Sequence, residues 1–103
     1  MNQLADPNVN LIRAKNGNEA WQICESQKDI DIVLMDIKMP EMNGYLATEK
    51  IKQLFPQIPV IAQSAFITEK VKAISYGCDD FLSKPFKKEE ILFKIHKHLK
   101  IKS

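Results

Sequence analysis

The stretch that decides the fold is residues 30–36, Ile30-Asp31-Ile32-Val33-Leu34-Met35-Asp36. Its four consecutive apolar residues, 32–35, are typical of a short strand that is covered on both faces. The apolar run stops at Asp36, and a loop is predicted over residues 37–42, which include Pro40. The stretch therefore predicts a buried strand that ends on an acidic side chain.

Strands and helices are predicted to alternate along the whole chain. Further strands are predicted over residues 9–15, 59–63 and 80–83, each bounded by turn residues or proline. Helices are predicted to begin at Asn18, at Asn43-Gly44, at Thr68 and after Pro85. This order predicts an α/β fold, a doubly wound parallel sheet in which four strands alternate with four helices.

The apolar positions within each helix recur three or four residues apart, which predicts the faces that pack on the sheet. These positions are Ala20, Ile23 and Cys24; Ala47, Ile51 and Leu54; Val71 and Ile74; and Ile91, Leu92, Ile95 and Leu99. Gly77 is predicted to end the third helix in the left-handed conformation.

Length and composition narrow the class of protein. The 103 residues suit one domain, and 45% hydrophobic and 27% charged residues are typical of a soluble globular protein. No apolar run approaches the ~18 residues of a membrane span, and the N-terminus lacks a signal-peptide pattern. Cys24 and Cys78 are expected to be reduced and buried, which favours the cytoplasm. The net charge of +2 is small, so the lysines after Pro85 are interpreted as a solvated helix face and not as a nucleic-acid site.

Three polar side chains directly follow predicted strands: Asp36, Ser64 and Lys84. Ligands of open α/β sheets bind outside the carboxyl ends of the strands, so these side chains are expected to converge. An aspartate can attack a phosphoryl group and form an aspartyl phosphate, whose oxygens an ammonium and a hydroxyl can stabilise. Mg²⁺ prefers oxygen ligands, for which Asp36 and the backbone carbonyl of Lys38 are candidates. The residues therefore favour phosphoryl transfer to Asp36.

Each of these residue types also has a purely structural interpretation. An aspartate at a strand end is often a cap or a turn former, and Lys84-Pro85 alone is typical of a strand-to-helix turn. Asp79 and Asp80 begin a strand, at the other edge of the sheet, and are interpreted as solvated turn residues. His96 and His98 lie two residues apart on a helix, so they do not face each other as metal ligands would and are expected at the surface.

Three segments resemble the motifs of response-regulator receiver domains, the phosphoaspartate domains of two-component signalling. They are residues 33–44 (VLMDIKMPEMNG), 62–65 (AQSA) and 77–86 (GCDDFLSKPF). Residues 16–20 (NGNEA) fit the family's second strand-to-helix turn. The similarity runs from about Val9 to Leu99 in the family's order and spacing, which makes the three motifs together specific.

The resemblance implies a function for each of these residues. Asp36 accepts a phosphoryl group from a histidine kinase or a phosphotransfer domain, with Mg²⁺ as the family's cofactor. Ser64 bonds that group and shifts on activation, Lys84 pairs with it, and Phe81 moves between outward and inward rotamers. The Lys84-Pro85 peptide bond is expected to be cis. A flavodoxin-like (CheY-like) sheet and a cytoplasmic phosphorelay partner are implied as well.

The chain departs from the family pattern in two places. Receivers begin with a strand that ends in an acidic pair, then a first helix; that strand and pair are absent before residue 9, which is expected to weaken Mg²⁺ binding. In the flavodoxin-like order 2-1-3-4-5 the absent strand is central. We therefore expect residues 9–15 to pair directly with residues 30–35, or with a second chain in a homodimer through the exposed sheet edge. The stretch from Ala65 to Tyr76 also looks a residue or two short.

The leading hypothesis is a phosphoacceptor receiver of a response regulator or a hybrid sensor kinase. The alternative is a phosphorylation-independent pseudo-receiver, an interaction or dimerisation module, which the missing acidic pair favours. No enzyme activity is expected, because an aspartate-nucleophile phosphatase needs a second aspartate where Lys38 stands. A nucleotide-binding domain is disfavoured because no Gly-rich phosphate loop exists.

Residues 1–103 are expected to form one receiver domain, truncated at its N-terminus, with no output domain and no membrane or nucleic-acid partner.

Overall fold

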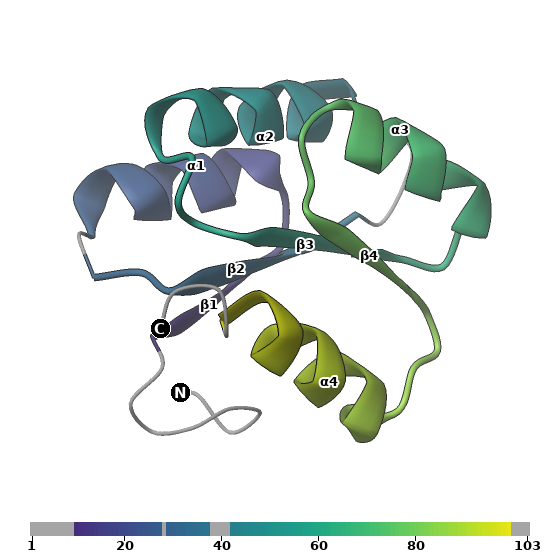
Figure 1. Ribbon diagram of the computed structural model, residues 1–103. Coiled ribbons are helices and arrows are strands. Elements are labelled where there is room, and N and C mark those ends of the chain that lie inside the picture. Colours follow the sequence, from purple (N-terminus) through teal and green to yellow (C-terminus); the bar gives the residue numbers. More distant parts are fainter. Residues whose placement is uncertain (1–9, 28, 38–41, 100–103) are drawn as a thin grey trace.

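The computed structural model describes residues 10–27, 29–37 and 42–99, in which strands and helices alternate as predicted (Figure 1). The elements are β1 (Leu11–Ala14), α1 (Gly17–Ser26), β2 (Ile32–Asp36), α2 (Met42–Leu54), β3 (Val60–Ser64), the 3-10 turn η1 (Ile67–Glu69), α3 (Lys70–Ser75), β4 (Asp80–Ser83) and α4 (Lys88–Leu99). The predicted class, a parallel sheet of four strands alternating with four α-helices, is confirmed for these residues.

The strands follow one another across the sheet in the order β1-β2-β3-β4, and every neighbouring pair is parallel. Leu11 of β1 lies opposite Ile32 of β2, and Ala14 lies opposite Met35. The predicted direct pairing of these two segments is therefore confirmed for Leu11–Ala14 and Ile32–Met35. Because all four strands are parallel, their carboxyl ends share one edge of the sheet, and helices return the chain to the other edge.

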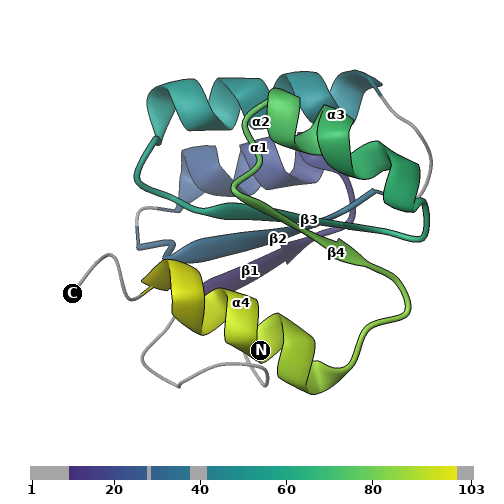
Figure 2. The same ribbon diagram turned by 45° about the vertical axis from the view of Figure 1, so that its right-hand side comes forward.

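Helices cover both faces of the sheet (Figures 1 and 2). The helices α1, α2 and α3 lie on one face, and α4 lies on the other. Successive strand residues point to opposite faces, so they fill two separate cores. Val33, Met35, Val60, Ala62 and Phe81 belong to the core under α1–α3, whereas Leu11, Ile32, Leu34, Ile61 and Leu82 belong to the core under α4. The position of a residue in its strand therefore decides which face it joins.

The N-cap of α1 lies two residues before Asn18, the predicted cap. Asn16 is the cap: its side-chain oxygen accepts a hydrogen bond from Glu19 N at 2.8 Å, and Glu19 Oε1 accepts one from Lys15 N at 2.8 Å. This reciprocal arrangement satisfies two backbone N–H groups near the helix start. Ala20 and Cys24 then turn inward as predicted.

The predicted inner faces of α2 and α3 are partly wrong. Leu54, Val71 and Ile74 are 60%, 79% and 42% exposed. The inner face of α2 is built from Tyr45, Thr48 and Ile51, all fully buried, and α3, with six residues, buries only Ala73. Apolar spacing alone favours any stripe of the right period, whereas the stripe that packs is set by how each helix lies on the sheet.

Gly77 ends α3 with φ = +110°, which confirms the predicted left-handed cap. A Cβ atom there would lie 3.2 Å from Lys52 Cγ. Gly77→Ala is therefore expected to lower the free energy of unfolding by about 1–2 kcal/mol. Urea denaturation measures the change, with Glu25→Ala on an exposed position of α1 as the control. Equal midpoints for Gly77→Ala and wild type would contradict the prediction.

Cys24 and Cys78 are free and buried, as predicted. Burial raises the pKa of the Cys78 thiol to about 12, so this cysteine stays protonated at neutral pH. Within the described ranges, no helix combines the length and apolar character that crossing a membrane requires.

Candidate functional site

The carboxyl edge of the sheet brings the three predicted site residues together. Asp36 is the last residue of β2, Ser64 is the last residue of β3, and Lys84 directly follows β4. In the register of the sheet, Asp36 lies beside Gln63 and Ser64 lies beside Ser83. Strand ends of a parallel sheet are where polar groups can meet a ligand without interrupting the core.

Asp36 and Lys84 form an ion pair at this edge. Lys84 Nζ donates to Asp36 Oδ1 at 2.7 Å, and the two side chains are 35% and 21% exposed, respectively. Backbone hydrogen bonds fix the chain at both residues of the pair. Next to Asp36, Ile37 N donates to Gln63 O, and Lys84 N donates to Ser64 O, each at 2.8 Å. The carboxylate is therefore fixed in position yet accessible to solutes.

An open depression of about 570 Å³ lies over the ion pair. Its described lining residues come from β1, β2 and β3 and from the segments that follow β3 and β4: Arg13, Asp36, Gln63, Ala65, Lys84, Pro85 and Phe86. Among the described residues of the lining, the ionisable side chains are two cations, Arg13 and Lys84, and one carboxylate, Asp36. This described part of the lining therefore has a net positive charge.

The alternation of side chains explains which residues line the depression. Leu34, Ile61 and Leu82 belong to the core under α4. The residues two positions later, Asp36, Gln63 and Lys84, emerge on the same face just beyond that core.

Arg13 reaches the same place from β1, two residues after Leu11 of the same core. The sequence pattern does not single out Arg13 or Gln63, because their relation to Asp36 depends on which strands are neighbours. The signal that could have found them is their position two residues after a buried apolar residue.

Ser64 lies at the same edge but faces the other side of the sheet. It follows Ala62 of the core under α1–α3 by two residues, and it is fully buried. Its Oγ accepts a hydrogen bond from Phe66 N at 3.0 Å. The structure therefore brings its neighbours Gln63 and Ala65, but not its hydroxyl, into the lining of the depression.

Phe81 and the turn after β4 complete the predicted set. Phe81 is 5% exposed and packs in the core under α1–α3, so its ring points inward. The Lys84-Pro85 bond is cis, as predicted. Lys38, whose carbonyl was the second candidate oxygen for Mg²⁺, lies outside the described residues.

Comparison with known protein families identifies the chain. Residues 1–96 match the response regulator receiver domain. The chain belongs to the receiver domain family. The receiver is also similar in sequence to the cell cycle response regulator CtrA of Brucella ovis and of Brucella abortus, with 37% identity over 70 residues in each case. The matched part is 66% of this receiver but only 30% of each relative.

Solved receiver structures have the same fold. The receiver domain of the Francisella response regulator 1452 has a TM-score of 0.76 at 20% identity, over 93% of this chain and 100% of that one. The response regulator TrrA of Thermotoga maritima, in complex with Mg²⁺-BeF, has a TM-score of 0.75 at 20% identity, over 88% of this chain and 99% of that one. The family match over residues 1–96 confirms the sequence resemblance at the family level.

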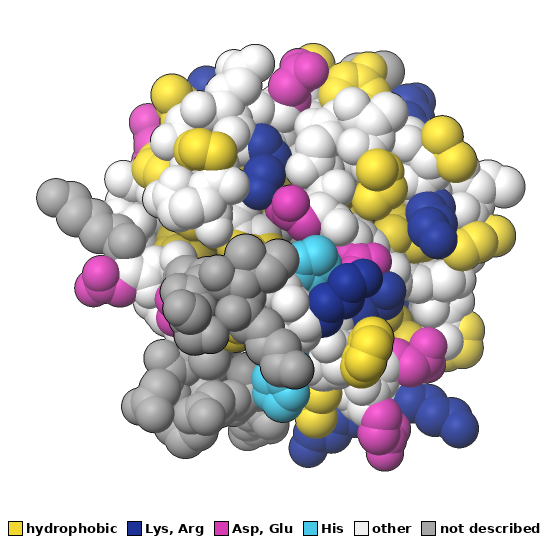
Figure 3. Space-filling model, viewed as in Figure 1, with side chains coloured by type: hydrophobic (Ala, Val, Ile, Leu, Met, Phe, Trp, Pro, Cys, Tyr) yellow, Lys and Arg dark blue, Asp and Glu magenta, His cyan; other side chains and the backbone are white. Residues whose placement is uncertain are grey.

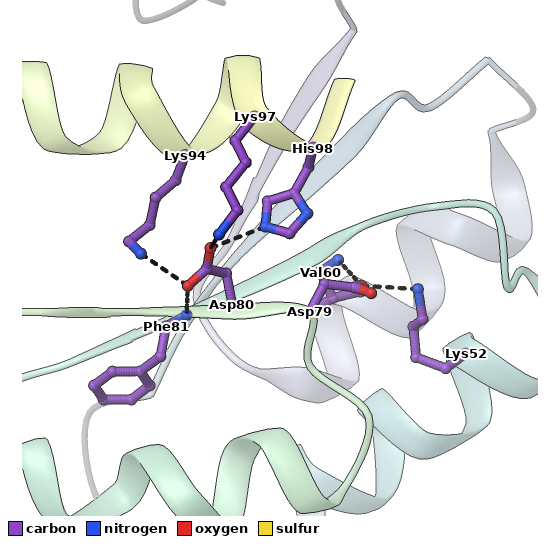
Figure 4. A network of polar contacts seen from close by, with 8 residues as sticks. All are labelled: Lys52, Val60, Asp79, Asp80, Phe81, Lys94, Lys97 and His98. Atoms are coloured by element: carbon purple, nitrogen blue, oxygen red, sulfur yellow. Dashed lines mark hydrogen bonds and ion pairs between the residues drawn. The ribbon is translucent and has the colours of Figure 1, made fainter. Parts of the chain in front are cut away.

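The opposite edge of the receiver's sheet holds a second polar network (Figure 4). Asp79 Oδ2 accepts hydrogen bonds from Lys52 Nζ and from Val60 N, both at 2.8 Å. It thereby ties α2 to the start of β3. Asp79 is exposed in the turn before β4, as predicted, and lies at the edge opposite Asp36. The ion pair that its carboxylate makes with Lys52 was not predicted.

Asp80 ties β4 to α4 in the same network. Its Oδ1 accepts from Lys94 Nζ and Phe81 N at 2.8 Å, and its Oδ2 lies 2.9 Å from His98 Nε2 and 3.9 Å from Lys97 Nζ. Figure 4 shows these side chains between α4 and β4, and Figure 3 shows a histidine side chain next to basic and acidic side chains on the same face of the molecule. The Asp80 side chain is 13% exposed, so its interpretation as a solvated turn residue is wrong, as is that of His98 as a simple surface residue.

The contacts of Asp80 change its acidity. Burial by itself raises the pKa of the carboxyl, but hydrogen bonds from Lys94, His98 and Phe81 N, together with the charge of Lys94, outweigh burial and lower the pKa to about 2. Asp80 is therefore ionised, and its contacts with Lys94, Lys97 and His98 link β4 to α4.

Proposed function

We propose that this receiver accepts a phosphoryl group on Asp36 from a phosphohistidine of a histidine kinase or a phosphotransfer domain. The observation that carries the proposal is the Asp36–Lys84 pair at 2.7 Å, in an open depression at the carboxyl edge of the sheet. A half-exposed ion pair adds at most about 1 kcal/mol to stability. Its position where ligands bind α/β sheets makes ligand chemistry the better explanation.

The reaction is an in-line displacement at phosphorus. Lys84 holds Oδ1 of Asp36, and Oδ2, which has no hydrogen-bond partner among the described residues, attacks. The Oδ2–P bond forms while the P–N bond to the donor histidine breaks, and the leaving imidazole nitrogen keeps the electron pair and then takes up a proton. Lys84 neutralises charge on the transferred oxygens, which is the main task of a phosphoryl-transfer site.

Ser64 and Phe81 would transmit the change. The Ser64 hydroxyl accepts from Phe66 N and keeps its own hydrogen, so it can donate to a phosphoryl oxygen after a rotation. That rotation would release Phe66 N and disturb the segment that leads into η1 and α3. Phe81, packed in the adjoining core, would follow by changing its rotamer.

Mg²⁺ is the family's expected cofactor, and the described residues do not fit it. A protein site for Mg²⁺ normally supplies one or two carboxylates that are free to coordinate. Among the described residues, Asp36 is the only carboxylate in the lining of the depression; it is paired with Lys84, and Arg13 lies in the same lining. Residues 10–27, 29–37 and 42–99 contain no group of three His, Cys, Asp or Glu that could hold a metal ion. No step of the proposed reaction is therefore assigned to the metal.

A phosphorylation-independent interaction module is the second candidate. The same poor fit to Mg²⁺ favours it, and β1, which pairs only with β2 in the described sheet, offers an edge for a homodimer. In either case we propose a cytoplasmic receiver that has no enzyme activity of its own and binds a protein partner and not nucleic acid or membrane.

Treatment with acetyl phosphate separates the two candidates. Phosphoacceptor function predicts an intact-mass gain of about 80 Da, followed by borohydride reduction that marks the acceptor in the peptide containing Asp36. A chain that stays unlabelled, with and without MgCl₂, would support the interaction module. Size-exclusion chromatography of the same samples reports whether that module is a dimer.

A further inference from the structure

We propose that the depression over Asp36 is an anion site that works without a divalent cation, in which Arg13 and Lys84 together neutralise a tetrahedral oxyanion. The inference rests on the proposed function where the anion is the phosphoryl group of Asp36. It stands independently of that function where the anion is free inorganic phosphate.

The order of the strands places Arg13 in the site. β1 is the direct neighbour of β2, and Arg13 lies opposite Leu34. Leu34 precedes Asp36 by two residues, so the side chains of Arg13, Leu34 and Asp36 are on the same face of the sheet. Adjacent strands lie about 4.8 Å apart, a distance that an arginine side chain easily spans. Arg13 is exposed and lines the depression with Asp36 and Lys84, so its guanidinium is free to turn toward a ligand there.

The charges of the lining favour an anion over a cation. Lys84 already balances the carboxylate of Asp36, and Arg13 adds one positive charge. From the described part of the lining, a divalent cation would meet a net positive charge and one carboxylate that is already paired with Lys84. A dianionic phosphoryl group on Asp36 would instead be balanced by one guanidinium and one ammonium.

The donors of the lining match the shape of the ligand. A guanidinium binds two oxygens of a phosphate side by side, and an ammonium binds a third as a point charge. Gln63, 7% exposed, adds an amide between them on β3. The ends of β1 and β3, together with the turn after β4, thus present donors to one depression.

NMR titration of the full chain in EDTA tests the inference, with inorganic phosphate as the probe. We expect phosphate to shift the backbone amide signals of residues lining the depression, and Arg13→Gln to weaken the affinity about tenfold, the value of one charge-assisted hydrogen bond. Lys97→Gln is the control: it removes the same charge at the opposite sheet edge, where Lys97 lies 3.9 Å from Asp80, and should leave phosphate affinity unchanged.

A second titration uses MgCl₂ alone on the wild-type chain and needs no variant. We expect no saturable shift of the same amide signals. Saturable Mg²⁺ binding at the depression, or equal phosphate affinity of Arg13→Gln and wild type, would overturn the inference. Phosphate binding that depends on Arg13, in a chain that acetyl phosphate fails to label, would support the anion site while rejecting the phosphoacceptor function.

Discussion

Asp36→Asn is expected to abolish the mass gain of about 80 Da that the wild-type chain acquires from acetyl phosphate. An amide oxygen is a far weaker nucleophile than a carboxylate, and the amide cannot form the stable acyl phosphate. The side chain keeps its size, and its lost partner Lys84 is 35% exposed, so water can solvate the ammonium. The fold should therefore survive, and intact-mass spectrometry reads the loss directly.

The matched control is Asp29→Asn. Asp29 precedes the same strand, its side chain is exposed, and it lies outside the lining of the depression. It should be labelled like the wild-type chain. Labelling of Asp36→Asn at the wild-type level would show that another residue is the acceptor and would remove Asp36 from the mechanism.

Asp80→Asn is expected to cause the largest loss of stability, about 2 kcal/mol at pH 7. The variant removes the charge that Lys94, Lys97 and His98 of α4 surround, and leaves the Lys94 ammonium, 26% exposed, without its ion-pair partner. α4 is the helix that covers one face of the described sheet alone (Figure 2). Loosening it should therefore destabilise the whole domain, which urea denaturation measures.

The effect depends on pH in a defined direction. The folded-state pKa of Asp80, about 2, lies below its ordinary value of 3.8. The stabilisation is therefore complete above the ordinary value and is lost as the pH falls toward 2. The difference between wild type and Asp80→Asn should narrow as the pH falls through this window. Glu89→Gln, on the exposed first turn of α4, should show no comparable effect; a wild-type midpoint for Asp80→Asn at pH 7 would contradict the prediction.

Local patterns predict much of this receiver. β4 coincides with the predicted strand at residues 80–83, and the apolar run at 32–35 with the buried part of β2. A short apolar run bounded by turn residues is a local feature of the sequence, so the strand it forms can be predicted without a structure. Val71 and Ile74 were predicted to face the core and are exposed, because the spacing of apolar residues does not determine how a helix is oriented on its sheet.

The sequence by itself determined the family and the positions of Asp36 and Lys84 at strand ends, because these follow from motif order and from where each apolar run stops. Only the tertiary structure decided what surrounds them. Direct pairing of β1 with β2 places Arg13 in the same depression as Asp36, and the packing of α4 gives Asp80 its basic partners. Both arrangements join residues far apart in the chain, and strand order and helix placement are settled by burial of the two cores as a whole and not by local pattern. The carboxylate expected to bind a cation thus lies, in the folded receiver, among groups suited to an anion.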